Sequence, residues 1–276
     1  MPIELTEGDV AAFRREGQLV VRAFYTPAEM AVLAATLAAD RALSTRALRV
    51  DDGHGGATEI ALWNFPGDDA FGALARGARL VDAAGALLGG EVYHYHSKIT
   101  AKRPGGGGTW VWHQDYGYWY GNGCLLPDML TVAIPLDPMS AANGCLQVLT
   151  GSHRMGRIDH GPVGAQTGAD PARVQAARGR FPQTPFEGEP GDVMFFHANT
   201  LHTSAPNLSG SPRTLLLVAF NTRANDPVRE HHHPCYTPLE VLADDELLGR
   251  AGRVEGDRRV FLIEGSDAVV PRGATR

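Results

Sequence analysis

Trp110-Val111-Trp112-His113-Gln114-Asp115 is the stretch on which the interpretation of the whole chain depends. It opens an aromatic run that continues to Tyr120, and we expect it to form a strand. Side chains two residues apart on a strand point to the same face, so His113 and Asp115 would project into one space. An imidazole and a carboxylate that converge in this way can bind a divalent metal if a third ligand arrives from another segment.

Short β-type runs lie on both sides of this stretch. We expect strands over residues 91–102, 110–115, 130–136, 145–149, 192–197 and 213–221, with Gly, Pro and Asn marking the turns between them. These strands do not alternate with helices, which argues against a Rossmann-type sheet. The pattern predicts a β-sandwich or a barrel.

The two ends of the chain have a different character. A helix is expected after Thr6, a second after the capping box Thr26-Pro27-Ala28-Glu29, and a long one over about 69–88, with weaker strands at 18–22, 48–51 and 59–63. Thr237-Pro238-Leu239-Glu240 predicts a short helix that ends near Gly249, and residues 258–263 are a possible last strand. We therefore expect a single domain over 1–276, with a mostly helical flank at 1–90, the β core at 91–222 and a C-terminal segment at 223–276.

Composition argues against several classes of protein. The 276 residues carry a formal charge of −6, which disfavours nucleic acid or an anionic membrane as the main partner. The three cysteines form no CxxC pair, which predicts free thiols in a reducing compartment. The first ten residues lack a signal-peptide pattern, and the longest apolar run, 215–220, is too short to cross a bilayer. We expect a cytoplasmic protein, and we expect it to be a monomer or a homodimer.

The third metal ligand should lie on a later strand that faces the same cavity. Gly191-Asp192 predicts a turn into the apolar strand 193–196, which leads to two candidate histidines. His202 begins the next segment and is the preferred candidate. His197 stays open as the alternative.

Arg213 opens a strand that is otherwise apolar as far as Phe220. A buried arginine is costly unless a carboxylate pairs with its planar guanidinium group. The side chain either reaches solvent or a protein carboxylate, or it anchors the far carboxylate of an anionic co-substrate. The residues alone leave both interpretations open.

Several motifs in a fixed order resemble the phytanoyl-CoA dioxygenase family of iron(II)- and 2-oxoglutarate-dependent oxygenases. The resemblance rests on His113-Gln114-Asp115, the strand after Gly191-Asp192, His202-Thr203-Ser204, Arg213, and Asn143-Gly144-Cys145-Leu146 followed by Gly151-Ser152-His153-Arg154. It spans roughly residues 91–221. It implies a mainly β fold with flanking helices, in which a double-stranded β-helix (jelly-roll) core follows N-terminal helices.

The resemblance also implies a set of site residues. His113, Asp115 and His202 would bind Fe(II) as a facial triad with three open positions and would form the catalytic centre. Arg213 would bind the distal carboxylate of 2-oxoglutarate, with the Ser204 hydroxyl as a partner, and O2 would be the other co-substrate. Thr100 matches a position that contacts 2-oxoglutarate in ectoine-hydroxylase-like members, where the residue is asparagine. The presence of Asp115 favours hydroxylation over halogenation.

Aromatic residues after the triplet are candidates for substrate contact. Tyr116, Tyr118 and Trp119 follow directly, and a continuing strand would send the two tyrosines to one side and Trp119 to the other. Such a wall suits a cation or a flat apolar group, or else it is ordinary packing.

His94, His96 and Lys98 alternate along strand 91–102 and would share one face. An inward face could bind an anionic head group, and an outward face would be solvated. Ectoine-hydroxylase-like enzymes carry a substrate-contacting glutamine at the position of His96. This difference speaks against ectoine as the substrate.

Together these observations predict an Fe(II)/2-oxoglutarate-dependent dioxygenase. It would hydroxylate an unactivated C–H bond of a small polar or zwitterionic molecule, such as an aminophosphonate or an amino-acid-like compound, and convert 2-oxoglutarate to succinate. An acyl-CoA or natural-product hydroxylase of the same family is one alternative, although the sequence shows no basic cluster for the phosphates of coenzyme A. Alternatives from other classes are a non-catalytic jelly-roll protein that binds a metal or ligand, and a cupin-type enzyme, which would leave Arg213 unexplained.

Overall fold

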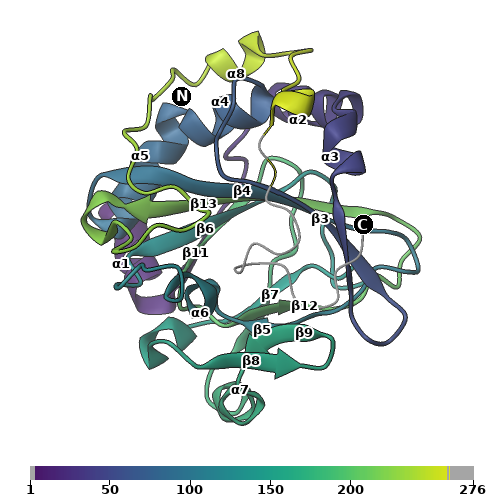
Figure 1. Ribbon diagram of the computed structural model, residues 1–276, viewed down its shortest axis with the longest axis vertical. Coiled ribbons are helices and arrows are strands. Elements are labelled where there is room, and N and C mark those ends of the chain that lie inside the picture. The colour runs from purple at the N-terminus through teal and green to yellow at the C-terminus, as the bar shows by residue number, and fades with distance from the viewer. Residues whose placement is uncertain (1–3, 260, 262–276) are drawn as a thin grey trace.

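Two antiparallel β-sheets face each other at the centre of the molecule (Figure 1). The computed structural model describes residues 4–259 and 261. The larger sheet has seven strands in the order β1 (Gln18–Val21), β11 (Val193–His197), β6 (Met129–Pro135), β13 (Arg213–Thr222), β4 (Val92–Lys102), β3 (Ala57–Trp63) and β2 (Leu48–Asp51). The smaller has four, in the order β10 (Gln183–Pro185), β7 (Leu146–Leu149), β12 (His202–Ser204) and β5 (Trp110–His113). This confirms the expected mainly β, jelly-roll architecture.

Alternation along the central strands explains why the larger sheet is apolar on both faces. On β13, Leu216 and Val218 join the core beneath the helices. Leu215 and Leu217 point the other way and pack with Leu146 and other residues that face the smaller sheet. The space between the sheets is therefore enclosed by side chains from both of them.

Helices cover the outer face of the larger sheet, as Figure 1 shows for α2, α4 and α5. The helices are α1 (Glu7–Glu16), α2 (Pro27–Ala39), α3 (Arg41–Thr45), α4 (Ala70–Arg76), α5 (Ala78–Leu88) and α8 (Glu246–Gly249). The expected capping box opens α2, where the Thr26 hydroxyl accepts from the Glu29 amide and the Glu29 carboxylate accepts from the Thr26 amide.

A further layer packs on the outer side of the smaller sheet. It consists of the hairpin β8 (His160–Val163) and β9 (Gln166–Ala169) with α7 (Pro171–Arg178), and it lies at the bottom of Figure 1. Its apolar side chains, among them Ile158 and Val174, pack with Leu149 and Leu201 of the smaller sheet and its connections. Among the residues described, no helix has the length and apolar character needed to span a membrane. Cys124, Cys145 and Cys235 are free thiols, as expected.

Two helix predictions were wrong for the same physical reason. The predicted helix over 69–88 is broken at Gly77, and the helix expected from Thr237 is absent until α8. Leu242 lies alongside Gly77 in extended conformation, where its amide donates to Arg76 and its carbonyl accepts from the Ala78 amide. Hydrogen bonds between distant segments thus replace the local helical ones in both places.

The segment 1–90 contributes more to the sheet than a helical flank would. The weak strands expected there form β1, β2 and β3, and all three belong to the larger sheet. The division of the chain into one domain with a core at 91–222 stays a prediction. Of the possible last strand at 258–263, Arg258 ends a 3-10 turn and Phe261 forms an isolated antiparallel bridge with Trp63, while residues 260, 262 and 263 lie outside the described residues.

Strand β4 contains an irregularity that changes which side chains face inward. Its pairing with β13 is regular as far as His96, which lies opposite Ala219, and then skips Tyr95 so that His94 lies opposite Phe220. A bulge of this kind places two consecutive residues on the same side of a sheet. Tyr95 and His96 both turn to the interior, and the prediction that His94 shares a face with His96 was wrong. The His94 imidazole instead hydrogen-bonds to the Ser97 hydroxyl, 2.8 Å away.

Candidate functional site

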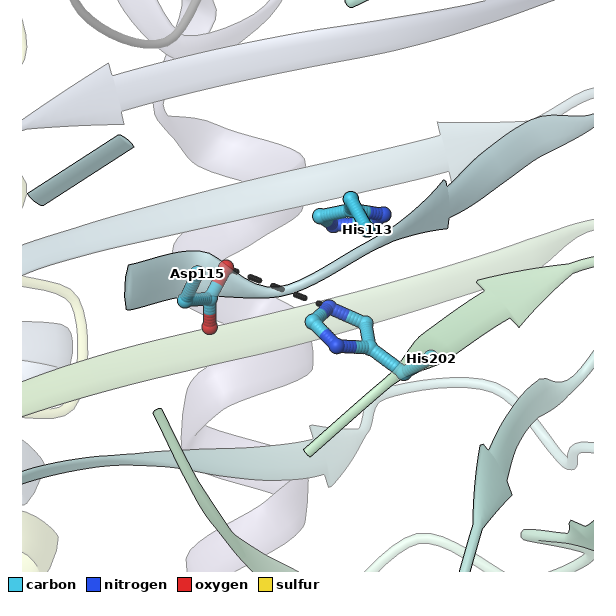
Figure 2. A group of neighbouring side chains, drawn as sticks. All are labelled: His113, Asp115 and His202. Atoms are coloured by element: carbon cyan, nitrogen blue, oxygen red, sulfur yellow. Dashed lines mark ion pairs between the residues drawn. The ribbon is translucent and has the colours of Figure 1, made fainter. Parts of the chain in front are cut away.

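Three side chains with ligand atoms converge between the two sheets (Figure 2). The ligand atoms of His113, Asp115 and His202 all lie within 4.8 Å of one another, and all three residues are buried. They converge because β5 and β12 are paired with His113 directly opposite His202. Nε2 of His202 lies 3.9 Å from Oδ1 of Asp115. No other comparable group of three occurs in the described part of the chain.

Hydrogen bonds fix both imidazoles in the form that a metal needs. Nδ1 of His113 lies 2.8 Å from the Val111 carbonyl, and Nδ1 of His202 lies 3.0 Å from the Thr200 carbonyl. A carbonyl can only accept, so each Nδ1 carries the proton and each Nε2 presents a lone pair. Burial lowers the pKa of both histidines, and for His113 the neighbouring His202 reinforces this effect. Neutral imidazoles are the form that binds a metal cation.

Asp115 reaches the site from a helix and not from a strand. β5 ends at His113, Gln114 has extended backbone angles, and Asp115 is the first residue of α6 (Asp115–Trp119). Because Gln114 is still extended, the expected alternation between His113 and Asp115 survives. The Thr131 hydroxyl donates to Oδ2 of Asp115 over 2.7 Å and holds the carboxylate in place.

His197, the alternative third ligand, lies elsewhere. Its ring packs against Phe13 and His153, with ring centroids 6.4 Å and 5.4 Å away, and its Nδ1 accepts from the Asn199 amide. These contacts place it toward α1, so the geometry favours His202.

Arg213 is buried in the same interior without an acidic partner. Its Nη1 donates to the Thr100 hydroxyl over 3.0 Å, and Nε and Nη2 donate to the Gly144 carbonyl. No ion pair to a carboxylate forms within the described residues, which excludes the protein-carboxylate interpretation left open by the sequence. Burial lowers the pKa of Arg213 to about 10, so the guanidinium stays charged at neutral pH.

Lys102 is a site residue that the sequence analysis missed. Its ammonium group donates to the Ser204 hydroxyl over 2.8 Å and to the Ala205 carbonyl, and it is almost fully buried. Burial, together with the charge of Arg213, lowers the pKa of Lys102 to about 6. A signal was available, because Lys102 lies two residues from Thr100 on the same strand and therefore on the same face.

A cavity between the sheets connects these groups. The cavity extends from His113 and His202 to the Arg213 guanidinium, and one of its walls comes from the smaller sheet. Its lining also includes Lys98, Thr100 and Ser204. The remaining walls are largely apolar, with Ile60 and Trp110 on one side and Leu215 and Leu217 on another. Such a cavity suits a slender dianion that bridges a metal and an arginine.

The two predicted polar contacts on β4 are buried beside the metal ligands. Nζ of Lys98 lies 3.9 Å from Oδ1 of Asp115. His96 is two residues away on the same face, and its ring centroid lies 5.6 Å from that of Trp119. Lys98 and His96 therefore face the interior, which was one of the two alternatives predicted for this strand.

The aromatic residues after Asp115 lie on a helix, so the expected alternation was wrong. Tyr116 and Trp119 are one helical turn apart and join the same buried cluster, and the Tyr116 hydroxyl donates to the Cys124 carbonyl. Tyr118 packs against the same cluster, with its ring centroid 5.9 Å from that of His113 and its hydroxyl donating to the Thr167 carbonyl. The structure thus brings the Tyr118 ring beside His113, whereas Tyr116 and Trp119 lie in the buried cluster, with Trp119 against His96.

Comparisons with known proteins agree with this geometry. A family model described as phytanoyl-CoA dioxygenase (PhyH) matches residues 13–215. The chain is 32% identical over 193 residues to the L-proline trans-4-hydroxylase of Streptomyces griseoviridis, a match that covers 64% of this chain and 70% of that protein. It is 27% identical over 263 residues to the ectoine dioxygenase of Streptomyces coelicolor, covering 88% of this chain and 87% of that one.

A solved structure extends the similarity to three dimensions. EctD from S. alaskensis with bound Fe is similar to this chain with a TM-score of 0.72 and 25% sequence identity. The match covers 87% of this chain and 88% of the other.

Proposed function

Because this chain belongs to the phytanoyl-CoA dioxygenase family, we propose that it hydroxylates a C–H bond of a small polar or zwitterionic molecule. The chain is an Fe(II)/2-oxoglutarate-dependent dioxygenase that acts on a small molecule. When bound, the iron and its co-substrate supply the activation of O2, with 2-oxoglutarate ending as succinate.

The iron ligands in this proposal are His113, Asp115 and His202. Two neutral imidazoles and one carboxylate are the donor set of a 2-His-1-carboxylate site, which leaves positions open for other ligands. The carbonyls that accept from each Nδ1 and the hydroxyl of Thr131 orient the three ligands. Metal sites depend on such outer contacts for both geometry and affinity.

Arg213 would bind the distal carboxylate of 2-oxoglutarate, with Ser204 and Thr100 beside it. The Thr100 hydroxyl accepts from Arg213 and the Ser204 hydroxyl accepts from Lys102. Each hydroxyl therefore has its own proton free to donate to an incoming carboxylate oxygen. Lys102 adds a further positive charge when it is protonated.

The observation that carries the substrate assignment is the buried position of Lys98 beside Asp115. An apolar acyl chain passing this point would offer no acceptor to the buried ammonium group, whose one ion pair among the described residues is to the proposed iron ligand Asp115, and burying its remaining N–H donors is costly. A carboxylate or a similar polar group on the substrate would satisfy it. The named relatives act on proline and ectoine, which are small polar compounds, and this agrees with the proposal.

The other candidate functions are less well supported. An acyl-CoA or natural-product hydroxylase would have to accommodate an apolar ligand next to Lys98. A non-catalytic binding protein would have no need for two fixed imidazole tautomers beside a buried, unpaired Arg213. The three free thiols agree with the proposed cytoplasmic location.

Absorption spectroscopy tests the co-substrate assignment. Anaerobic protein with Fe(II) and 2-oxoglutarate should show a weak visible metal-to-ligand band, and Arg213→Ala should lose it at the same ligand concentration. Arg223→Ala, which removes an exposed arginine paired with Glu91, serves as the control and should keep the band. No band in the iron-loaded wild type, or a full band in Arg213→Ala, would contradict the proposal.

Succinate formation tests the substrate class. Small zwitterions should increase the conversion of 2-oxoglutarate to succinate above the rate without substrate. Acyl-CoA thioesters should not, and stimulation by them alone would favour the alternative.

A further inference from the structure

A pair of buried histidines with no hydrogen-bond partner lies next to the proposed iron site. The rings of His96 and His233 have centroids 4.9 Å apart and are tilted by 35°. Both residues are almost fully buried, and all four ring nitrogens lack a hydrogen-bond partner within the described part of the chain. Buried polar atoms are nearly always paired in folded proteins. Such a concentration of unpaired nitrogens indicates a missing ligand.

The pair is assembled from two distant segments. The β4 bulge turns His96 and Tyr95 into the interior, and His233 arrives from the C-terminal segment after β13. The ring of His233 packs against Tyr95 with centroids 4.5 Å apart. Trp119, four residues after Asp115, packs against His96. The pair therefore packs against α6, the same short helix that carries Asp115.

The electrostatic surroundings of the pair are basic. Lys98, His94 and His232 act on both rings, and His231 acts on His233 as well. Lys98 follows His96 on the same face of β4, and its ammonium group lies 3.9 Å from Oδ1 of Asp115. A cationic group of a substrate would be repelled here, and an anion would be attracted.

The chemistry of imidazole points to the same kind of ligand. Burial lowers the pKa of His96 and His233, so each ring is neutral and carries one N–H donor and one acceptor nitrogen. An oxygen-rich anion can accept from both N–H groups and from an ammonium group at once. The alternative, a second metal site, lacks support because these rings are not part of any described cluster of three metal-ligand groups.

We propose that His96 and His233, together with Lys98, bind an oxyanion head group of the substrate, a carboxylate, phosphonate or sulfonate, and so orient its C–H bond toward the iron. The inference rests on the proposed function and narrows its substrate class to anions and zwitterions. It also gives the C-terminal segment a role in substrate recognition, since His233 lies outside the residues matched by the family model.

Small methyl-bearing probes test this subsite directly. Anaerobic protein is loaded with Fe(II) and saturating 2-oxoglutarate, so that the Arg213 pocket is already filled. Methylphosphonate, methanesulfonate and acetate are then titrated and followed by the visible band and by calorimetry. Dimethyl sulfone is the neutral probe of similar shape, and tetramethylammonium is the cationic one. At least one oxyanion should perturb the band and bind at least tenfold more tightly than either of these two.

Variants link the selectivity to the two histidines. His96→Leu and His233→Leu should each weaken oxyanion binding by at least tenfold and abolish the preference over dimethyl sulfone. His96→Gln and His233→Gln keep an N–H donor and should lose less, which separates recognition from a folding defect. His153→Gln, a half-buried histidine beside α1, is the control and should bind as the wild type does.

The outcomes separate this inference from the proposed function. A normal Fe(II)–2-oxoglutarate band with no oxyanion binding, or with binding that both leucine variants retain, would overturn the inference and leave the co-substrate assignment standing. Equal binding of dimethyl sulfone would also overturn it. Absence of the band in the wild type would overturn the proposed function, and this inference with it.

Discussion

The ammonium group of Lys102 donates a hydrogen bond to the Ser204 hydroxyl, with 2.8 Å between the heavy atoms. This bond occupies the hydroxyl oxygen as an acceptor, so the Ser204 proton is directed elsewhere. Ser204 lines the cavity that also contains the Arg213 guanidinium, and Lys102 lies behind Ser204. Lys102 thus acts on the proposed carboxylate pocket in two ways, through Ser204 and, once protonated, through its own charge.

Replacing this lysine should weaken co-substrate binding without removing the metal. We expect Lys102→Met to raise the Kd for 2-oxoglutarate by roughly tenfold to a hundredfold, because a hydrogen bond to a charged group contributes about 1.5–3 kcal/mol. Calorimetry measures the change. Arg103→Met, which removes the exposed neighbouring cation paired with Glu59, is the control. An unchanged Kd in Lys102→Met would show that the lysine has no part in the pocket.

Binding of 2-oxoglutarate should take up a proton above about pH 6. The pKa of Lys102 is about 6 in the empty pocket, and a dianion nearby would raise it. The affinity should therefore fall as the pH rises above 6, since the neutral amine must first be protonated. Calorimetry in two buffers with different ionisation enthalpies detects the uptake. Proton uptake that persists in Lys102→Met would assign it to another group.

The two candidate third ligands should behave differently. His202→Ala should lower Fe(II) binding by at least a hundredfold because it removes one of three ligands. His197→Ala should leave Fe(II) binding unchanged, since its ring packs against Phe13 and His153. Equilibrium dialysis against Fe(II) measures both. Loss of iron from His197→Ala alone, in a protein that remains folded, would reverse the assignment.

Gly144 should not tolerate a side chain. It has a φ of +75°, and a Cβ there would lie 2.2 Å from the Ala205 carbonyl oxygen that accepts from Lys102. Gly144→Ala should lower both the Tm and the affinity for 2-oxoglutarate. Gly164 has a similar φ of +60°, but a Cβ there would meet no atom within 4 Å. Gly164→Ala therefore measures the effect of the backbone strain without the clash. Equal effects of the two variants on co-substrate affinity would argue against a role for Gly144 in shaping the pocket.

The metal-free protein should lose stability in mild acid. Burial lowers the pKa of His94 to about 3 and that of His197 to about 4 in the folded protein. In the unfolded chain both histidines would titrate near 6.5. The unfolded state therefore binds more protons, and the stability present above pH 6.5 is lost as the pH falls toward 4. At pH 5.5 each histidine should lower the free energy of unfolding by about 1.4 kcal/mol. Urea unfolding at pH 7.5 and 5.5 measures this, and His94→Gln should reduce the difference.

Local rules predicted much of this fold. The Thr6 and Thr26 caps and the left-handed Gly17 delimit α1 and α2 as expected, because capping depends on residues within one helical turn. The ligand triplet was also predictable. Alternation of side chains needs only that Gln114 remain extended, which it does although α6 begins immediately afterward.

Features that depend on distant segments could not be predicted in this way. The bulge in β4 is defined by its pairing with β13, more than a hundred residues later. The break at Gly77 depends on Leu242, and the approach of His233 to His96 depends on the course of the C-terminal segment. No periodicity within a short window contains this information.

The bulge in β4 divides the strand into two halves whose inward-facing residues have opposite parity. From Lys102 back to His96, even-numbered residues face the interior, and beyond the bulge odd-numbered residues such as Tyr95 and Tyr93 do so. Substitutions at 93 and 95 can therefore reshape the proposed substrate end while Thr100 and Lys102 remain in place at the co-substrate end. Deleting the one extra residue would exchange the inward and outward side chains on one half of the strand only. Substrate preference and co-substrate dependence are thus separable by design within a single strand.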